Sequence, residues 1–151
     1  MAKAKIQGIR LILPLFASSF LSRKLCCKLT KPSEFAIRKF SVKLEGKAAS
    51  ISARKVSFLG KALGLMFRSR NTSNLLFDFE RKSNIGLHSL FVFFPFMVIW
   101  LDDKNNVLDW QIAKPFSWHI SSQCDFSKII EVPLNSKNKG VIEFFVGSRK
   151  V

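Results

Sequence analysis

Apolar and polar residues alternate along the chain after Pro32-Ser33, where an N-terminal leader is expected to end. Apolar residues occupy alternate positions at 35 and 37, then at 40, 42 and 44, and after Glu45-Gly46 at 49, 51 and 53. A period of two is typical of strands that are buried on one face. The pattern therefore predicts a hairpin of two strands within residues 34–56.

Shorter apolar runs predict the remaining elements. Ser57 is a suitable N-cap for a short helix over residues 58–65, because apolar residues follow it at helical spacing. The polar stretches 80–86 and 102–106 are expected to be turns. Further strands are predicted over 75–79, 107–113, 129–132 and 141–146.

Residues 87–101 form the most apolar part of the chain, and no charged residue lies between Lys82 and Asp102. A transmembrane helix is one interpretation, but Pro95 lies in the middle, and an interior proline costs a helix about 3 kcal/mol. Phe, Val, Ile and Trp, which dominate the segment, favour strands. We therefore expect two buried strands on either side of Pro95.

Seven or eight short strands with frequent turns are typical of a sandwich or a barrel. A chain of 151 residues has room for one domain of ordinary size. We expect a mainly β fold, a compact β-sandwich or partly open barrel with one short helix. This single domain would cover residues 34–151 and follow a basic leader over residues 1–33.

Charge is concentrated at the start of the chain. Residues 1–70 hold 16 basic and 2 acidic residues, and seven of these basic residues precede Glu34. The uncharged run 11–21 is shorter than the roughly 20 residues of a spanning helix, but it fits an export signal or an organellar transit peptide. We expect residues 1–33 to be such a signal, an anchor on an anionic membrane surface, or disordered. Location at a membrane or outside the cell is favoured, and an organelle if the source is eukaryotic.

Few residues suggest chemistry. No recognised catalytic motif is present, and no cofactor is expected. His88, His119 and Cys124 are the soft metal ligands of the domain, but their spacing does not require zinc. Arg68 can bind an anion or, as the preferred interpretation, a carboxylate such as Asp102 or Glu131. The aromatic residues lie mainly in apolar runs, so Met66 and Phe67 are expected in the core, and nucleic acid is not an expected partner.

An ordered series of motifs resembles a known family. GLMFR, residues 64–68, is followed by LLFDF, LHSLFVFFPFMVIWLDD, KNNVLDWQIAKPF and IIEVP. This series is similar to the domain of unknown function 192 family (DUF192, also called uncharacterised protein family UPF0127) over about residues 40–135. The resemblance implies a small jelly-roll-like β domain without an established activity. It places the family motif on Gly64, Met66, Phe67, Arg68, His88 and Asp102. Met97 stands where the family usually has Asp, which weakens any acid–base site.

Three hypotheses about function remain. The first is a non-enzymatic, monomeric binding or accessory protein, exported or associated with a membrane, whose partner is an unknown small ligand or protein. The second is an enzyme or metal-binding protein that uses Arg68, His88 and Asp102. The third is a basic RNA-associated protein.

Overall fold

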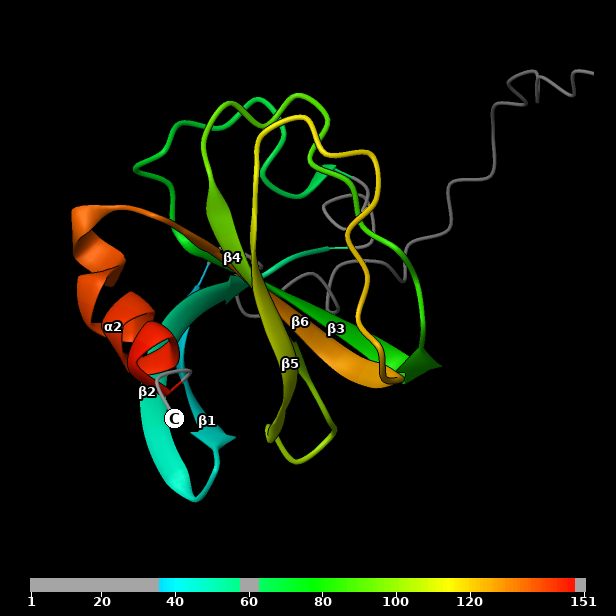
Figure 1. Ribbon diagram of the computed structural model, residues 1–151, viewed down its shortest axis with the longest axis vertical. Coiled ribbons are helices and arrows are strands. Elements are labelled where there is room, and N and C mark those ends of the chain that lie inside the picture. Colours follow the sequence, from blue (N-terminus) through cyan, green and yellow to red (C-terminus); the bar gives the residue numbers. More distant parts are fainter. Residues whose placement is uncertain (1–35, 58–62, 149–151) are drawn as a thin grey trace, which may run out of the picture. The chain divides into compact units, whose positions relative to one another are not determined.

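The computed structural model describes residues 36–57 and 63–148. These residues form one mixed sheet and a C-terminal helix (Figure 1). The elements are β1 (Ile37–Leu44), β2 (Lys47–Lys55), β3 (Asn74–Ser83), β4 (Phe96–Leu101), β5 (Val107–Ala113), β6 (Phe126–Pro133), the 3-10 helix η1 (Ser136–Asn138) and α2 (Lys139–Ser148).

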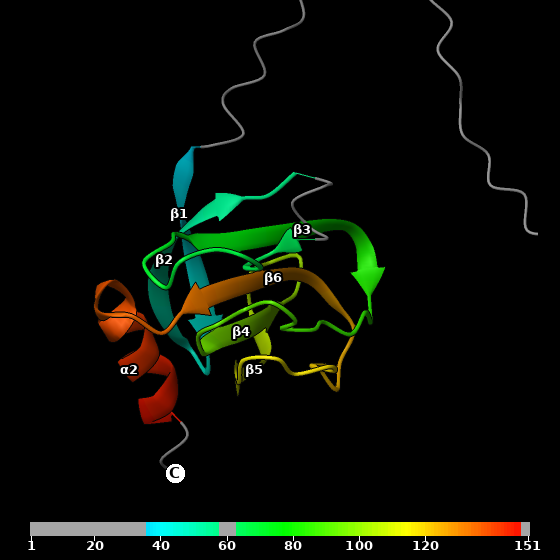
Figure 2. The ribbon, with the colours of Figure 1, turned by 90° about the horizontal axis from the view of Figure 1, so that it is seen from above.

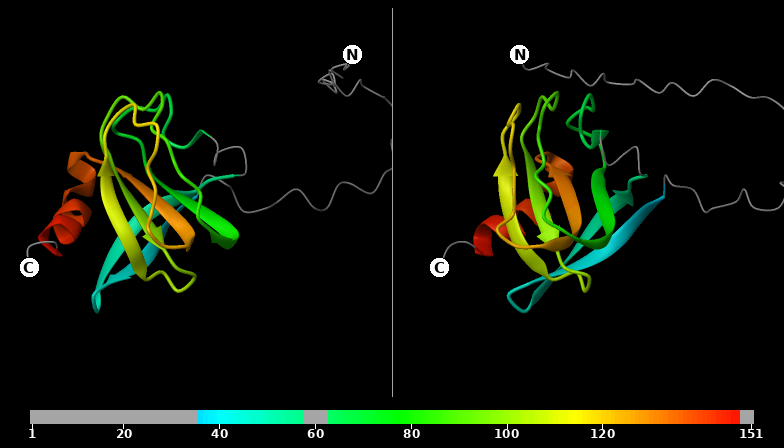
Figure 3. Two further views of the ribbon diagram at one scale, coloured as in Figure 1. Left: turned by 45° about the vertical axis from the view of Figure 1, so that its right-hand side comes forward. Right: turned by 90° about the vertical axis from the view of Figure 1, so that its right-hand side faces the viewer.

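The six strands follow the order β1-β2-β3-β6-β4-β5. Strands β2 and β3 are parallel, and the other neighbouring strands are antiparallel. The sheet curls into a half-barrel (Figure 3), and the backbone N–H of Lys43 in β1 reaches the carbonyl of Asn105 beside β5 at 3.0 Å. The predicted mainly β fold, a partly open barrel with one short helix, is confirmed.

Turn chemistry explains the two predicted hairpins. Glu45 and Gly46 both have positive φ, 50° and 79°, which is the backbone of a two-residue turn that matches the twist of its strands. In the β4–β5 turn, the Asp102 carboxylate accepts hydrogen bonds from the backbone N–H groups of Lys104 and Asn106 at 2.9 and 2.7 Å. Both turns lie where the sequence predicts them.

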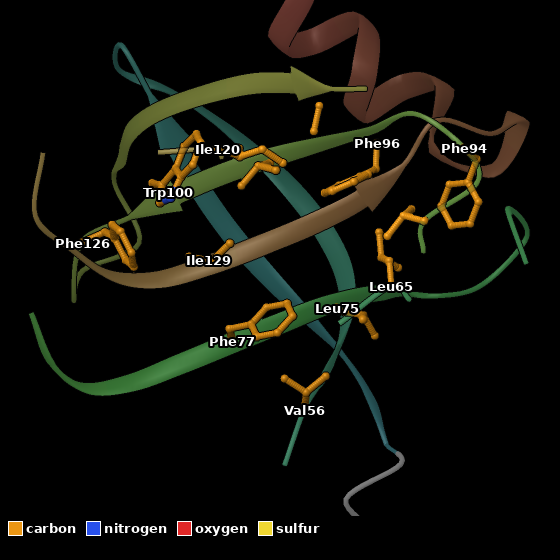
Figure 4. Packing of buried hydrophobic residues seen from close by; sticks show 13 residues of the cluster. Val56, Leu65, Leu75, Phe77, Phe94, Phe96, Trp100, Ile120, Phe126 and Ile129 are labelled. Carbon is orange, nitrogen blue, oxygen red and sulfur yellow. The ribbon is translucent and has the colours of Figure 1, made fainter. Parts of the chain in front are cut away.

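Both faces of the sheet are buried. On one face, strands β3, β4 and β6 pack under the loops that precede β3 and β4 (Figure 4). The other face receives side chains from all six strands, and Phe145 of α2 packs into it with its ring 5.8 Å from that of Trp110. Figure 2 shows α2 beside the edge of the sheet. Burial of one such large side chain stabilises the fold by about 1.5–3 kcal/mol.

The prediction of a final strand over residues 141–146 is wrong, because this segment lies in α2. Phe145 is fully buried, and Val141 and Ile142, four and three residues earlier, are half-buried against the same cluster. That spacing places these three residues on one helical face. The short apolar run, interrupted by Glu143, also fitted a strand, because periodicity does not separate a helix from a strand over so few residues.

The segment over residues 87–101 contains one strand, β4, and not two. Residues 87–95 are irregular, with Phe91 at φ 58°, a value that a strand does not allow. Strand β3 continues through residues 80–83, which were expected to form a turn, because Ser83 still pairs with Phe126 of β6. The described residues therefore contain six strands, fewer than the seven or eight expected.

The helix predicted over residues 58–65 falls mainly on residues 58–62, outside the described residues. Among residues 36–57 and 63–148, no helix has both the length and the apolar character needed to cross a membrane.

Candidate functional site

The GLMFR motif forms two overlapping turns between β2 and β3. The backbone N–H of Met66 donates to the carbonyl of Leu63 at 2.8 Å, and that of Arg68 donates to the carbonyl of Leu65 at 3.2 Å. The Arg68 side chain closes the motif, since its Nε donates to the carbonyl of Gly64 at 2.9 Å. Leu65 is buried, Met66 is half-buried and the Phe67 side chain is exposed. The turn is thus anchored through Leu65 and presents Phe67 outward.

Glu131 lies directly beneath this turn. It sits in the middle of β6, paired with Leu75 of β3 on one side and Val98 of β4 on the other. Gly64 packs so closely on it that an added Cβ would lie 3.2 Å from Glu131 Oε2 and 3.6 Å from Phe77. Glycine suits this position for two reasons. A side chain would press on Glu131, and the positive φ of Gly64, 49°, is adopted more readily by glycine than by other residues.

The surroundings of Glu131 favour its neutral form. Burial raises the pKa of Glu131 to about 8, against the opposing effects of the Arg68 charge and a hydrogen bond from the backbone N–H of Leu65. Burial and the charge of Arg54 lower the pKa of Arg68, while Glu131 raises it. Glu131 Oε2 is buried without a hydrogen-bond partner. The carboxyl group is therefore largely protonated at pH 7.

The GLMFR turn lies in segment 63–70, which meets the loop segments 86–95 and 114–121 (Figures 1 and 3). We call these three segments together the loop end. The backbone N–H of Phe67 donates to the carbonyl of Phe91 at 3.0 Å, and that of Phe116 donates to the carbonyl of Ser89 at 3.1 Å. The hydroxyl of the buried Ser89 accepts from the backbone N–H of Ser117 at 2.7 Å and donates to the carbonyl of Lys114 at 2.6 Å. These bonds hold the three loops together.

The loop end carries aromatic side chains in solvent. Five of them are between 51% and 80% exposed: Phe67, Phe91, Phe93, Phe116 and Trp118. Two pairs are in contact, with Phe67 stacked on Phe91 at 5.0 Å between ring centroids and Phe93 edge-on to Phe116 at 5.3 Å. The expectation that Phe67 lies in the core is wrong, because a left-handed backbone turns its side chain away from the sheet.

The other predicted site residues lie in two places. His88 is exposed within the segment 86–95, and Gly64, Met66, Phe67 and Arg68 belong to segment 63–70 of the same loop end. Asp102 comes directly after β4, whereas segment 86–95 of the loop end comes directly before it. The two therefore lie at opposite ends of this strand.

The Asp102 carboxylate serves the β4–β5 turn. Burial raises the pKa of Asp102, but hydrogen bonds from Asn106 and Lys104 outweigh this effect, so that its pKa lies below the usual value. Asp102 Oδ2 also accepts from Asn106 Nδ2 at 2.7 Å. Of the two carboxylates considered for Arg68, the structure therefore brings Glu131 close and leaves Asp102 engaged elsewhere.

A metal centre is not formed by the candidate ligands. Within the part of the chain that the structure describes, no three His, Cys, Asp or Glu residues are grouped closely enough to hold a metal ion. The exposed imidazole of His119 instead packs on Gly86, where an added Cβ would lie 2.7 Å from its Cε1. Cys124 is a free, exposed thiol.

Four of the exposed aromatic residues were not singled out from the sequence: Phe91, Phe93, Phe116 and Trp118. Their runs are apolar, and apolar runs usually indicate burial. One signal was available, because the segments 63–70, 86–95 and 114–121 contain no acidic residue and include three basic ones. Glu131 was considered as a partner for Arg68, but its neutral state depends on tertiary packing.

Two solved structures resemble this fold. One is a protein from Sinorhizobium meliloti 1021 named as a candidate transcription regulator, with a TM-score of 0.57 and 18% identity over 72% of this chain and 90% of that one. The other is a protein of unknown function from Novosphingobium aromaticivorans DSM 12444, with a TM-score of 0.60 and 14% identity over 74% of this chain and 82% of that one. At these identities the likeness concerns the fold.

The sequence comparisons give the family. No curated protein matches the chain. The model of the DUF192 family, described as "Uncharacterized ACR", matches residues 42–143, which include the GLMFR turn, Glu131 and the whole loop end. The chain therefore belongs to the DUF192 family.

Proposed function

We propose that the protein is a non-enzymatic binding protein associated with a membrane, and that the loop end is its contact surface for a small ligand or a partner. The observation that supports this proposal is the cluster of five exposed aromatic side chains. Exposed apolar patches on monomeric proteins often mark interaction sites. Aromatic residues are also enriched among the residues that dominate binding energy.

Hydrogen bonds and core packing fix the conformation of the loop end. Backbone hydrogen bonds join its three segments, and the buried Ser89 hydroxyl links two of them. Below, Leu65 is inserted in the core and Gly64 rests on Glu131. A contact surface that is ordered before binding loses less conformational entropy when it binds.

The enzyme hypothesis has less support. Asp102 is engaged in the β4–β5 turn, away from Arg68 and His88. Met97, which replaces the usual family Asp, is fully buried in the cluster on the face opposite Glu131. A general acid and base must both reach the same reacting group, and these residues do not converge.

Membrane association rests on the leader. Residues 1–33 lie outside the described residues, and they carry seven basic residues and no acidic one. Each basic residue near an anionic lipid surface contributes about 1 kcal/mol of attraction. The proposal predicts that full-length protein sediments with the membrane fraction of cells, and that replacing these seven residues by Gln lowers the sedimented fraction. Release of wild-type protein into the supernatant would contradict the membrane part of the proposal.

The contact surface is tested with the anionic aromatic dye 1-anilinonaphthalene-8-sulfonate and full-length protein. We expect wild-type protein to enhance the dye fluorescence and the double variant Phe67→Asn/Phe93→Ser to bind the dye at least about fivefold more weakly. Leu108→Ser is the matched control, because Leu108 is an exposed apolar residue near the opposite end of β5. Equal binding by all three proteins would contradict the proposed surface.

The enzyme or metal hypothesis is tested with Zn²⁺, Mg²⁺ and Mn²⁺, each added alone to full-length protein. We expect none of them to raise the melting temperature. A rise that His88→Ala abolishes would favour a metal-binding function instead.

A further inference from the structure

We infer that the loop end docks onto an anionic lipid bilayer, with its aromatic side chains in the interfacial region and its basic side chains at the headgroups. The inference rests on the proposed function, because it takes the loop end to be the contact surface. It goes further by identifying an anionic lipid bilayer as what this surface binds. Backbone conformation, charge and the identity of the exposed rings support it independently.

The backbone of the loop end is strained where its aromatic residues project. Phe67, Phe91 and Phe116 have φ values of 55°, 58° and 58°. A left-handed backbone is costly for a bulky side chain and easily adopted by Gly or Asn. Strain of this kind is usually retained where it serves function. Since all three side chains are at least half exposed, core packing does not explain why Phe occupies these positions.

The charge of the loop end suits an anionic surface. Arg68 and Arg70 lie in segment 63–70 and the exposed Lys114 in segment 114–121, and none of the three segments contains an acidic residue. The Nε atoms of Arg68 and Arg70 donate to backbone carbonyls, which leaves the positive charge of both groups in place. The carboxyl group of Glu131 beneath is buried and largely neutral, so it does not cancel this charge. Basic residues beside exposed aromatic rings are the combination with which proteins bind bilayer interfaces.

The exposed rings include a residue type that is enriched at membrane–water interfaces. Trp118, 80% exposed, is the most exposed of the five, and tryptophan is enriched where proteins meet the headgroup region. A second copy of the chain is a less suitable occupant, because contact between two loop ends would bring like charges together. Charge complementarity therefore favours an anionic lipid surface over a second copy of the chain as the partner of the loop end.

Trp118 provides a local probe of docking. The chain has three Trp residues, and the other two, Trp100 and Trp110, are buried. We would add full-length protein to vesicles of phosphatidylcholine, with or without 30% phosphatidylglycerol, and record the emission maximum and its quenching by brominated lipid. The same measurements use a leader-neutral protein, in which the seven basic residues before Glu34 are replaced by Gln.

We expect anionic vesicles to shift the emission to shorter wavelength and brominated lipid to quench it, in both proteins. Phosphatidylcholine alone should have little effect. The triple variant Phe67→Asn/Phe91→Asn/Phe116→Asn should bind anionic vesicles at least about tenfold more weakly than wild type. Lys114→Gln should weaken binding about fivefold, and Leu108→Ser should bind as wild type does.

The triple variant also separates docking from folding. Asn adopts the left-handed backbone more readily than Phe, so the variant should melt within a few degrees of wild type. Protein that binds vesicles with unchanged Trp118 emission would overturn the inference and leave membrane association through the leader intact. Loss of vesicle binding by the leader-neutral protein, with dye binding retained, would also overturn it and leave the contact surface intact. A dimer that the triple variant converts to monomer would identify a second copy as the occupant instead.

Discussion

Glu131→Gln tests the state of the buried carboxyl group. Glutamine has nearly the shape of a protonated glutamate but does not ionise. The pKa of Glu131 is raised from 4.5 to about 8 by burial beneath the GLMFR turn. The variant therefore keeps the packing around Gly64 and removes the titration.

The sign of the effect follows from proton linkage. The folded state keeps the proton between pH 4.5 and about 8, while the unfolded chain releases it. The contribution of Glu131 to stability is therefore complete below pH 4.5 and is lost as the pH rises toward 8. At about 1.4 kcal/mol per pH unit, the loss is on the order of 4 kcal/mol. The Gln variant does not undergo this loss.

The assay is thermal unfolding of full-length wild type, Glu131→Gln and a control at pH 5, 6, 7, 8 and 9. At pH 5 we expect wild type and Glu131→Gln to melt at similar temperatures. At pH 8 the variant should melt higher by on the order of 10 °C. The control is Glu143→Gln, since Glu143 is an exposed residue of α2 whose side chain retains 66% exposure in its pair with Lys139.

The comparison with wild type isolates Glu131, because every other titrating group is shared. Parallel profiles from pH 5 to pH 9 would refute the reasoning, since they would mean that Glu131 titrates alike in the folded and unfolded states. A variant less stable than wild type at pH 8 would refute it as well, because it would show that the charged form stabilises the fold.

Three further substitutions and one control test the fold by denaturant unfolding at pH 6. Gly64→Ala should destabilise the fold by about 2–3 kcal/mol. The control Gly46→Ala should cost about 1 kcal/mol, because Gly46 also has a positive φ but has no atom within 4 Å of an added Cβ. Equal losses of stability would contradict the close packing of Gly64 on Glu131. Asp102→Ala should destabilise by about 1–2 kcal/mol without affecting vesicle binding, because three hydrogen bonds of the β4–β5 turn are lost. Phe145→Ala should cost about 3–5 kcal/mol, and a smaller loss would mean that α2 is not part of the core.

Sequence patterns predicted the elements that depend on local physics. The hairpin at Glu45-Gly46 and the turn after Asp102 follow from residues that tolerate or stabilise turns. The strand predicted at residues 141–146 failed because five apolar residues in a short run fit a buried strand and an amphipathic helix equally well.

The candidate site was predicted in part. The motif residues Gly64 to Arg68 do lie together, and Glu131 does lie close to Arg68. The exposure of Phe91 and Phe93 was not predictable, because apolarity indicates burial on average and a left-handed backbone follows from tertiary contacts. The raised pKa of Glu131 likewise arises only when the loops cover β6.

The incomplete closure of the half-barrel leaves β1 as an edge strand. Beyond the contact at Lys43, the outer side of β1 faces no neighbouring strand among residues 36–57 and 63–148, and such an edge can recruit a strand from another molecule. Arg38, Lys39 and Lys43 stand exposed along it. Two such edges repel each other, so part of the positive charge in the first half of the chain protects the protein against edge-to-edge aggregation.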